Sequence, residues 1–239
     1  MHWTLAGNLG ETLAALEAAA AAGAVGCVCT ELAVTGFHRR LPELIDAEAL
    51  ADAEAQLRAA CARLGLAAAV GLPTLMPDGA VLNSHVYIDA DGREVGRVHK
   101  RGLTPSEATF FTAGGPRGWV PLAGAHVSSV LCREMLDGAS LLPELAASAP
   151  QDGAPRVIFW PSYVGESDEA AAAACKAYRA GACALAAALG AWVLQSNWPE
   201  GLNLPGATGF GGSVVIDPAG RLHDRLPMDR AAVCLVTLG

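Results

Sequence analysis

Three side chains that could act together in nucleophilic catalysis each stand at the end of an apolar, strand-like run: Glu31, Lys100 and Cys132. The runs that precede them are residues 25–30, 94–99 and 126–131. A charged side chain is costly to bury unless it is paired or takes part in chemistry. Open α/β folds place reactive groups at the ends of strands. A thiol, a carboxylate and an ammonium group in such positions are a nucleophile, a base and a cation for acyl transfer.

Each of these residues also has a purely structural interpretation. A lone cysteine is more often packed in a core, because the thiol behaves as a small apolar group. Glu31 and Lys100 could form a buried ion pair with no chemistry. The presence of all three residues, each within its own extended motif, favours catalysis over these alternatives.

The three motifs together resemble those of the nitrilase superfamily of carbon–nitrogen hydrolases. ELAVTGF begins with Glu31, KRGLTPSEATFFTAG begins with Lys100 and contains Glu107, and LCREMLD contains Cys132. The order glutamate, lysine, cysteine is that of the family, and the resemblance covers most of the chain. Three motifs in the family order are far more specific than any one of them. The resemblance implies a single carbon–nitrogen hydrolase domain over residues 1–239 and a cysteine-dependent amidohydrolase.

The resemblance also implies roles for the individual residues. Cys132 would attack the substrate and form a thioester. Glu31 would take the thiol proton and later activate water. Lys100 would lower the thiol pKa and stabilise the negative charge on the carbonyl oxygen. Glu107 would hold Lys100 in place or assist the proton transfers.

Arg133, directly after the cysteine, has two expected roles. Its backbone N–H is a candidate second donor to the oxyanion. Its guanidinium either binds a substrate carboxylate or pairs with a structural carboxylate such as Glu134. Because true nitrilases tend to have tryptophan at this position, we expect an amide substrate rather than a nitrile. Asn197 resembles an asparagine that ends a later strand in the family, where a structural hydrogen-bonding role is the usual one. The alternative function is a nitrilase-like binding or regulatory protein without turnover.

Composition excludes several classes of partner. The chain has 239 residues, of which 52% are hydrophobic and 17% are charged, so it can bury a large core. Its net charge of −8 argues against nucleic acid, because no basic cluster is present to neutralise phosphates. The longest uncharged run, residues 180–194, is too short to span a bilayer, so no membrane partner is expected. The expected partner is a small-molecule amide, and the resemblance adds a homodimer or larger homo-oligomer.

The seven cysteines favour a reducing compartment, and therefore the cytoplasm, because a chain of this size needs no disulfides for stability. Cys27 and Cys29 form a CxC pair, but no third ligand is spaced nearby. We therefore expect no metal. No Walker loop is present, and no cofactor is expected.

The elements that must position these residues alternate between helices and strands, which indicates a mixed α/β fold. The first helix is expected to begin at Asn8, whose side chain would cap it. The resemblance implies a four-layer α-β-β-α sandwich of the nitrilase type, with the usual first strand barely formed because only MHWTLAG precedes Asn8. The predicted helices span residues 8–22, 46–64, 139–148 and 168–189. The predicted strands span residues 25–30, 67–72, 82–88, 94–99, 126–131, 156–160, 191–196, 213–216 and 231–238.

Overall fold

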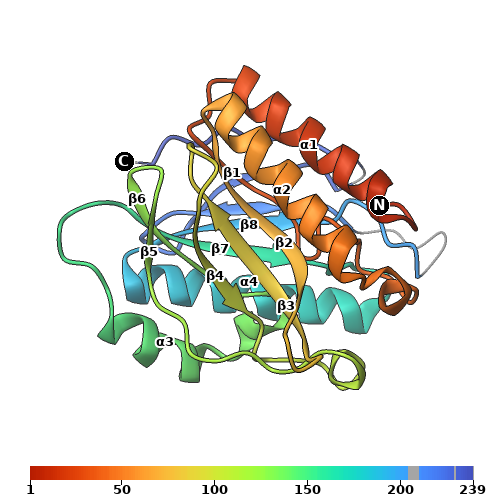
Figure 1. Cartoon of the computed structure of the whole chain (residues 1–239). Helices are drawn as coiled ribbons and strands as arrows, with labels where there is room; N and C mark the ends of the chain where they lie inside the picture. Colours follow the sequence, from red (N-terminus) through yellow and green to blue (C-terminus); the bar gives the residue numbers. More distant parts are fainter. Residues whose placement is uncertain (204–209, 229, 239) are drawn as a thin grey trace.

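Two β-sheets lie face to face between two layers of α-helix in the computed structural model, which describes residues 1–203, 210–228 and 230–238 (Figure 1). Helices α1 and α2 cover one outer side, and α3 and α4 cover the other. The helices are α1 (Leu5–Ala21), α2 (Ala47–Leu64), α3 (Gly138–Ala147) and α4 (Glu169–Leu189), with short 3-10 turns η1 (Leu41–Leu44), η2 (Glu107–Thr109) and η3 (Cys132–Leu136). This arrangement confirms the predicted α-β-β-α sandwich.

The first sheet has the strand order β1-β2-β3-β4. Strand β1 pairs parallel with β2, whereas β2, β3 and β4 form an antiparallel meander. Leu16 of α1 and Leu57 of α2 pack with Leu72 and Val86 of the sheet in one buried cluster. Gly65 ends α2 in a left-handed conformation, as glycine does most readily. The strands are β1 (Gly26–Val28), β2 (Ala67–Leu75), β3 (Val81–Ile88) and β4 (Glu94–His99).

The second sheet has the order β10-β9-β8-β7-β6-β5. Its centre is parallel, because β6, β7 and β8 are joined by crossovers through α3 and α4. Leu145 of α3 and Leu185 of α4 pack with Ile158 and Val193 of the sheet. The strands are β5 (Val120–Leu122), β6 (Ala125–Ser129), β7 (Arg156–Ser162), β8 (Trp192–Asn197), β9 (Val214–Ile216) and β10 (Leu222–Arg225).

The inner faces of the two sheets form a third buried cluster, to which Tyr87 and Val98 contribute from the first sheet and Val127 and Phe159 from the second. This contact holds the carboxyl ends of strands from both sheets in a fixed relation. The packing therefore determines where the residues that follow those strands can meet.

The chain termini depart from the predicted elements. Helix α1 begins at Leu5 because the side chain of Thr4, not of Asn8, accepts a hydrogen bond from the first turn. The Asn8 side chain instead exchanges hydrogen bonds with the backbone of His2. Residues 1–4 form no strand.

The predicted last strand over residues 231–238 is wrong, because this segment joins neither sheet. Val236 and Leu238 nevertheless pack against the cluster between the sheets, so part of this apolar run is covered without being paired. The short strand β5 was not predicted. It returns to β6 through Ala123 and Gly124, which both have positive φ, and Ala123 is a residue type that gives no turn signal.

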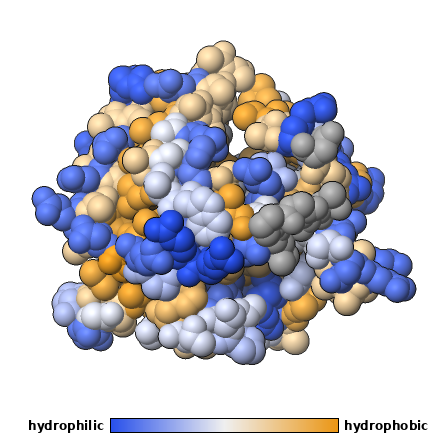
Figure 2. Space-filling model, turned by 90° about the vertical axis from the view of Figure 1, so that its right-hand side faces the viewer, coloured by the Kyte–Doolittle hydropathy of each residue, from blue (hydrophilic) through white to orange (hydrophobic). Residues whose placement is uncertain are grey.

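Polar and apolar residues are intermingled on the face of the molecule shown in Figure 2. Within residues 1–203, 210–228 and 230–238, no helix has the length and apolar character needed to cross a membrane.

Candidate active site

The segments that follow β1, β4 and β6 bring Glu31, Lys100 and Cys132 together. The Lys100 Nζ atom lies 2.7 Å from Oε1 of Glu31 and 2.5 Å from Oε1 of Glu107. All three charged side chains are buried, with at most 2% exposed. Cys132 is close enough that the charges of Glu31, Lys100 and Glu107 all act on the pKa of its thiol. The structure therefore places the four residues in one cluster, although they come from both sheets.

The turn that carries Glu31 is built by close backbone packing. Leu32 has a φ of 50°, which is unusual for a residue other than glycine. A side chain at Gly71 of β2 would collide with the backbone of Thr30 and Leu32, so only glycine lets the turn lie this close. Trp198 Nε1 donates to the Glu31 carbonyl at 2.7 Å. These contacts fix the backbone from which the carboxylate projects.

The two carboxylate oxygens of Glu31 differ in their hydrogen bonds. Oε1 accepts hydrogen bonds from Asn83 Nδ2 at 2.9 Å and from Lys100 Nζ. Oε2 is buried and receives no hydrogen bond from any described protein group. One oxygen is thus used for orientation, and the other is available to accept a proton.

Lys100 is fixed through the loop that follows it. Its backbone N–H donates to Asn83 O at 2.8 Å, and Glu107 Oε2 accepts the backbone N–H of Thr104 at 2.8 Å. Phe110 and Phe111 lie just after Glu107 and pack in a small apolar cluster, with Phe111 4% exposed. The paired phenylalanines therefore anchor this loop.

Cys132 is the first residue of η3 and occupies a strained backbone position just after β6. Its φ is 50°, a left-handed conformation that residues with a side chain rarely adopt. Trp160 Nε1 donates to the Cys132 carbonyl at 3.0 Å. The thiol lies 3.8 Å from the carbonyl oxygen of Tyr163. In this conformation the thiol lies close enough to Glu31, Lys100 and Glu107 for their charges to act on it.

The electrostatics of the cluster follow from burial and pairing. Burial raises the pKa of Glu31, although the charge of Lys100 opposes the shift. Burial and the charge of Glu31 raise the pKa of the Cys132 thiol, against the lowering effect of Lys100. Burial disfavours the Lys100 ammonium, but the charges of Glu31, Cys132 and Glu107 raise its pKa. The cluster therefore holds a neutral thiol beside a carboxylate whose proton affinity is increased.

The side chain of Arg133 makes a contact that the sequence did not predict. Its guanidinium pairs with Asp137 at 3.1 Å, and its side chain is 29% exposed. The alternative pairing with Glu134 does not form, because Glu134 is already bound to Arg117. Asn197 fulfils the expected structural role, since its side chain exchanges hydrogen bonds with the backbone of Val164.

Several residues of the site carried no readable signal in the sequence. The ring of Phe37 stacks on that of Tyr163 at 4.9 Å between centroids, and Phe210 lies 5.2 Å from Tyr163. The Lys100 Nζ atom lies 6.0 Å from the Phe37 centroid, so this aromatic cluster adjoins the charged one. Asn83 was missed as well, although an asparagine inside an apolar strand is a signal that could have been used. The described residues contain no group of three metal-ligating side chains, and the CxC pair does not belong to one.

Comparison with known proteins identifies the family. The carbon–nitrogen hydrolase family model matches residues 1–238. A search of curated proteins found no match.

Similar solved structures include three of an amidase from the bacterium Nesterenkonia, two of which are mutants in complex with acrylamide and with butyramide. The acrylamide complex has a TM-score of 0.77, and the chains are 21% identical over 95% of this chain and 82% of the other. The butyramide complex has a TM-score of 0.78, with 21% identity over 95% of this chain and 82% of the other. The third structure has a TM-score of 0.76, with 21% identity over 95% of this chain and 82% of the other.

These structures share the fold of this chain. The family model supports the predicted enzyme class at the level of a carbon–nitrogen hydrolase. Because the family model covers nearly the whole chain, the resemblance that the three motifs indicated is confirmed. The chain belongs to the carbon–nitrogen hydrolase family.

Proposed function

We propose that this protein hydrolyses a small amide to a carboxylic acid and ammonia through a thioester on Cys132. The observation that carries the proposal is the buried Lys100 ammonium, which is shared by the carboxylates of Glu31 and Glu107 beside the thiol. A buried ion pair without chemistry would need no nucleophile held at its edge in a strained conformation.

In the first half of the reaction, the Cys132 sulfur attacks the amide carbonyl carbon while its proton passes to Oε2 of Glu31. The carbonyl oxygen becomes an oxyanion, which the Lys100 ammonium and the backbone N–H of Arg133 stabilise. When the carbon–nitrogen bond breaks, Glu31 returns the proton to the leaving nitrogen. Ammonia departs, and the acyl group remains on sulfur as a thioester.

In the second half, Glu31 removes a proton from water, and the resulting hydroxide attacks the thioester carbonyl. The tetrahedral intermediate collapses with cleavage of the carbon–sulfur bond. The sulfur recovers a proton from Glu31, and the carboxylic acid leaves. Glu107 remains hydrogen-bonded to Lys100 throughout and keeps the ammonium in place.

The aromatic cluster supports a small, largely apolar acyl group as the substrate. The Phe37 ring adjoins Lys100 and stacks on Tyr163, whose backbone carbonyl adjoins the thiol, so an acyl chain bound beside Lys100 would lie near these rings. Mutants of the similar Nesterenkonia amidase form complexes with acrylamide and with butyramide, and in another mutant the acetamide moiety of fluoroacetamide is added covalently to the active-site cysteine. The Arg133 guanidinium is engaged by Asp137, which disfavours a substrate carboxylate at that position.

The test is release of ammonia from a panel of acetamide, acrylamide and butyramide, with a rapid-quench search for an acyl adduct on Cys132. We expect a burst of one ammonia per active site, followed by steady turnover. Binding of these amides with neither ammonia nor adduct would instead establish a binding protein without turnover.

We also propose a cytoplasmic homodimer or larger homo-oligomer, as the family resemblance implies. All seven cysteines are free thiols, which supports a reducing compartment. Light scattering at micromolar concentration tests the assembly, and a stable monomer would contradict it.

A further inference from the structure

The carboxylate of Glu134 connects the segment that follows Lys100 to the segment that precedes Cys132. Its Oε1 atom accepts the backbone N–H groups of Arg101 at 2.7 Å and Gly102 at 2.9 Å. Its Oε2 atom accepts the backbone N–H of Leu131 at 2.9 Å. One buried side chain, 1% exposed, thus holds the chain next to the ammonium and next to the nucleophile.

Arg117 balances the charge of this carboxylate. Its two terminal nitrogens each lie 2.7 Å from a different oxygen of Glu134, a bidentate pairing that fixes the plane of the carboxylate. The same guanidinium donates to the carbonyl of Ser129, the last residue of β6, at 2.8 Å. The Arg117 side chain is 0% exposed. The pair therefore binds the end of β6, just before the segment that carries Cys132.

Stability alone is a weak explanation for such a pair. Buried ion pairs can often be replaced by apolar residues of similar volume without loss of stability, because desolvation offsets the attraction. The two side chains do not only pair with each other. They also form hydrogen bonds with the backbone next to Lys100 and with the backbone just before Cys132. The left-handed backbone of Cys132 also persists only where its surroundings over-determine it.

We infer that Glu134 and Arg117 are positioning residues, which hold Cys132 in its left-handed conformation and set the distance between its sulfur and the Lys100 ammonium. The inference rests on the proposed roles of Cys132 and Lys100. Neither Glu134 nor Arg117 needs to touch the substrate. Without the pair, Cys132 and Lys100 would both be present, but the sulfur would lie at the wrong distance from the ammonium. A displacement of about 1 Å can lower the rate about 10²-fold.

The decisive variant is the double substitution Glu134→Gln with Arg117→Met, which removes both charges while keeping the approximate volumes. A single substitution would leave one buried charge unpaired and could unfold the protein. We expect the double variant to fold, with kcat lowered about 10²-fold and KM changed by less than about threefold, since the loss concerns the transition state. The rate of iodoacetamide modification of Cys132 against pH should also change, because the thiol will face the ammonium at a different distance.

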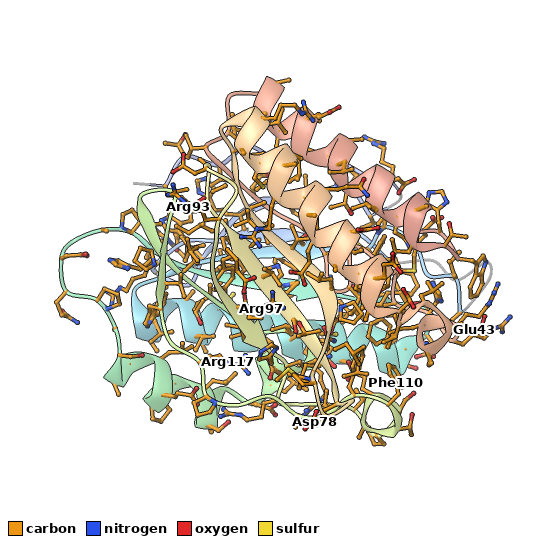
Figure 3. All side chains as sticks on the ribbon, in the orientation of Figure 1. Glu43, Asp78, Arg93, Arg97, Phe110 and Arg117 are labelled. Carbon is orange, nitrogen blue, oxygen red and sulfur yellow. The ribbon has the colours of Figure 1, made fainter. Side chains whose placement is uncertain are left out.

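A matched control lies on β4. Arg97 pairs with Glu94 at 2.6 Å and with Glu54 at 3.1 Å, and its side chain is 20% exposed. Figure 3 shows Arg97 on β4 and Arg117 near the carboxyl end of β4, where Lys100 follows. Glu94→Gln with Arg97→Met should alter thermal stability but leave kcat and the alkylation profile as in the unsubstituted protein.

A double variant with unchanged kcat and an unchanged alkylation profile would overturn the inference. If this variant does not fold, Glu134→Asp serves in its place, because it keeps the charge for Arg117 but withdraws the carboxylate from the two backbone segments. Here too we expect reduced kcat in a folded protein, and full activity would overturn the inference. The alkylation profile needs no turnover, so it tests the positioning role even if the proposed amide hydrolysis fails.

Discussion

Glu31 and Lys100 meet through one carboxylate oxygen only: Nζ of Lys100 lies 2.7 Å from Oε1 of Glu31, while Oε2 of Glu31 has no hydrogen-bond donor among the described protein groups. The second carboxylate, that of Glu107, takes another of the three ammonium protons. The lysine can therefore remain charged during a reaction in which Glu31 gains and loses a proton. This division explains how one cation can orient a base and stabilise an oxyanion together.

The first prediction concerns the nucleophile. Cys132→Ala should lower ammonia release by at least about 10³-fold, because no other group in the cluster can form the thioester. Amide binding and the melting temperature should change little, since the substitution removes only a sulfur atom. Calorimetric titration with butyramide and thermal melting measure these quantities. Ordinary turnover in this variant would end the assignment of Cys132.

The second prediction concerns the cation. Lys100→Ala should abolish turnover while affinity for the amide falls less, because the ammonium acts mainly on the oxyanion. It should also lower the free energy of unfolding by about 3–5 kcal/mol, since two buried carboxylates lose their partner. Steady-state kinetics and urea unfolding separate the two effects.

Lys176→Ala is the control for this change, because Lys176 is an exposed lysine on α4 and should alter neither quantity. If Lys100→Ala raised KM and left kcat unchanged, Lys100 would be a substrate-binding residue instead.

The third prediction concerns the base. Glu31→Gln keeps the shape of the side chain and should lower kcat about 10²–10⁴-fold through loss of the proton acceptor. The Cys132 thiol should also react more slowly with iodoacetamide near neutral pH. The opposite sign would follow if the electrostatic effect dominated, because removal of the carboxylate charge lowers the thiol pKa. A variant that alkylates faster but remains inactive would assign Glu31 to water activation.

The fourth prediction concerns pH. Burial raises the pKa of Glu31 above the usual value of about 4.5, so the carboxylate takes up its proton at a higher pH than an exposed glutamate. Only the deprotonated form can act as a base. When kcat/KM is plotted against pH, its decrease toward low pH should therefore have a midpoint above pH 4.5. The profile of Glu31→Gln should lack this decrease. An acid limb at or below 4.5 would show that another group controls it.

The sequence by itself was enough to identify the reactive residues of the candidate site. Glu31, Lys100 and Cys132 were recognisable because each follows an apolar strand and because the motifs occur in the family order. Local signals also placed most helices and strands, since capping residues and terminal glycines act within a few residues. The helix that ends at Gly190 is one example, with its left-handed cap adopting the conformation that glycine favours.

Only the tertiary structure decided which charges pair. Arg133 and Glu134 are adjacent in the sequence, yet Arg133 binds Asp137 one turn further on, and Glu134 binds Arg117 across the nucleophile turn. The predicted last strand failed for a related reason. Its apolar run suggests a strand, but Val236 and Leu238 pack against the cluster between the sheets without joining either sheet. Which residues are buried and which charges pair depend on segments that packing brings together. The spacing of residues along the chain does not specify the distances between those segments.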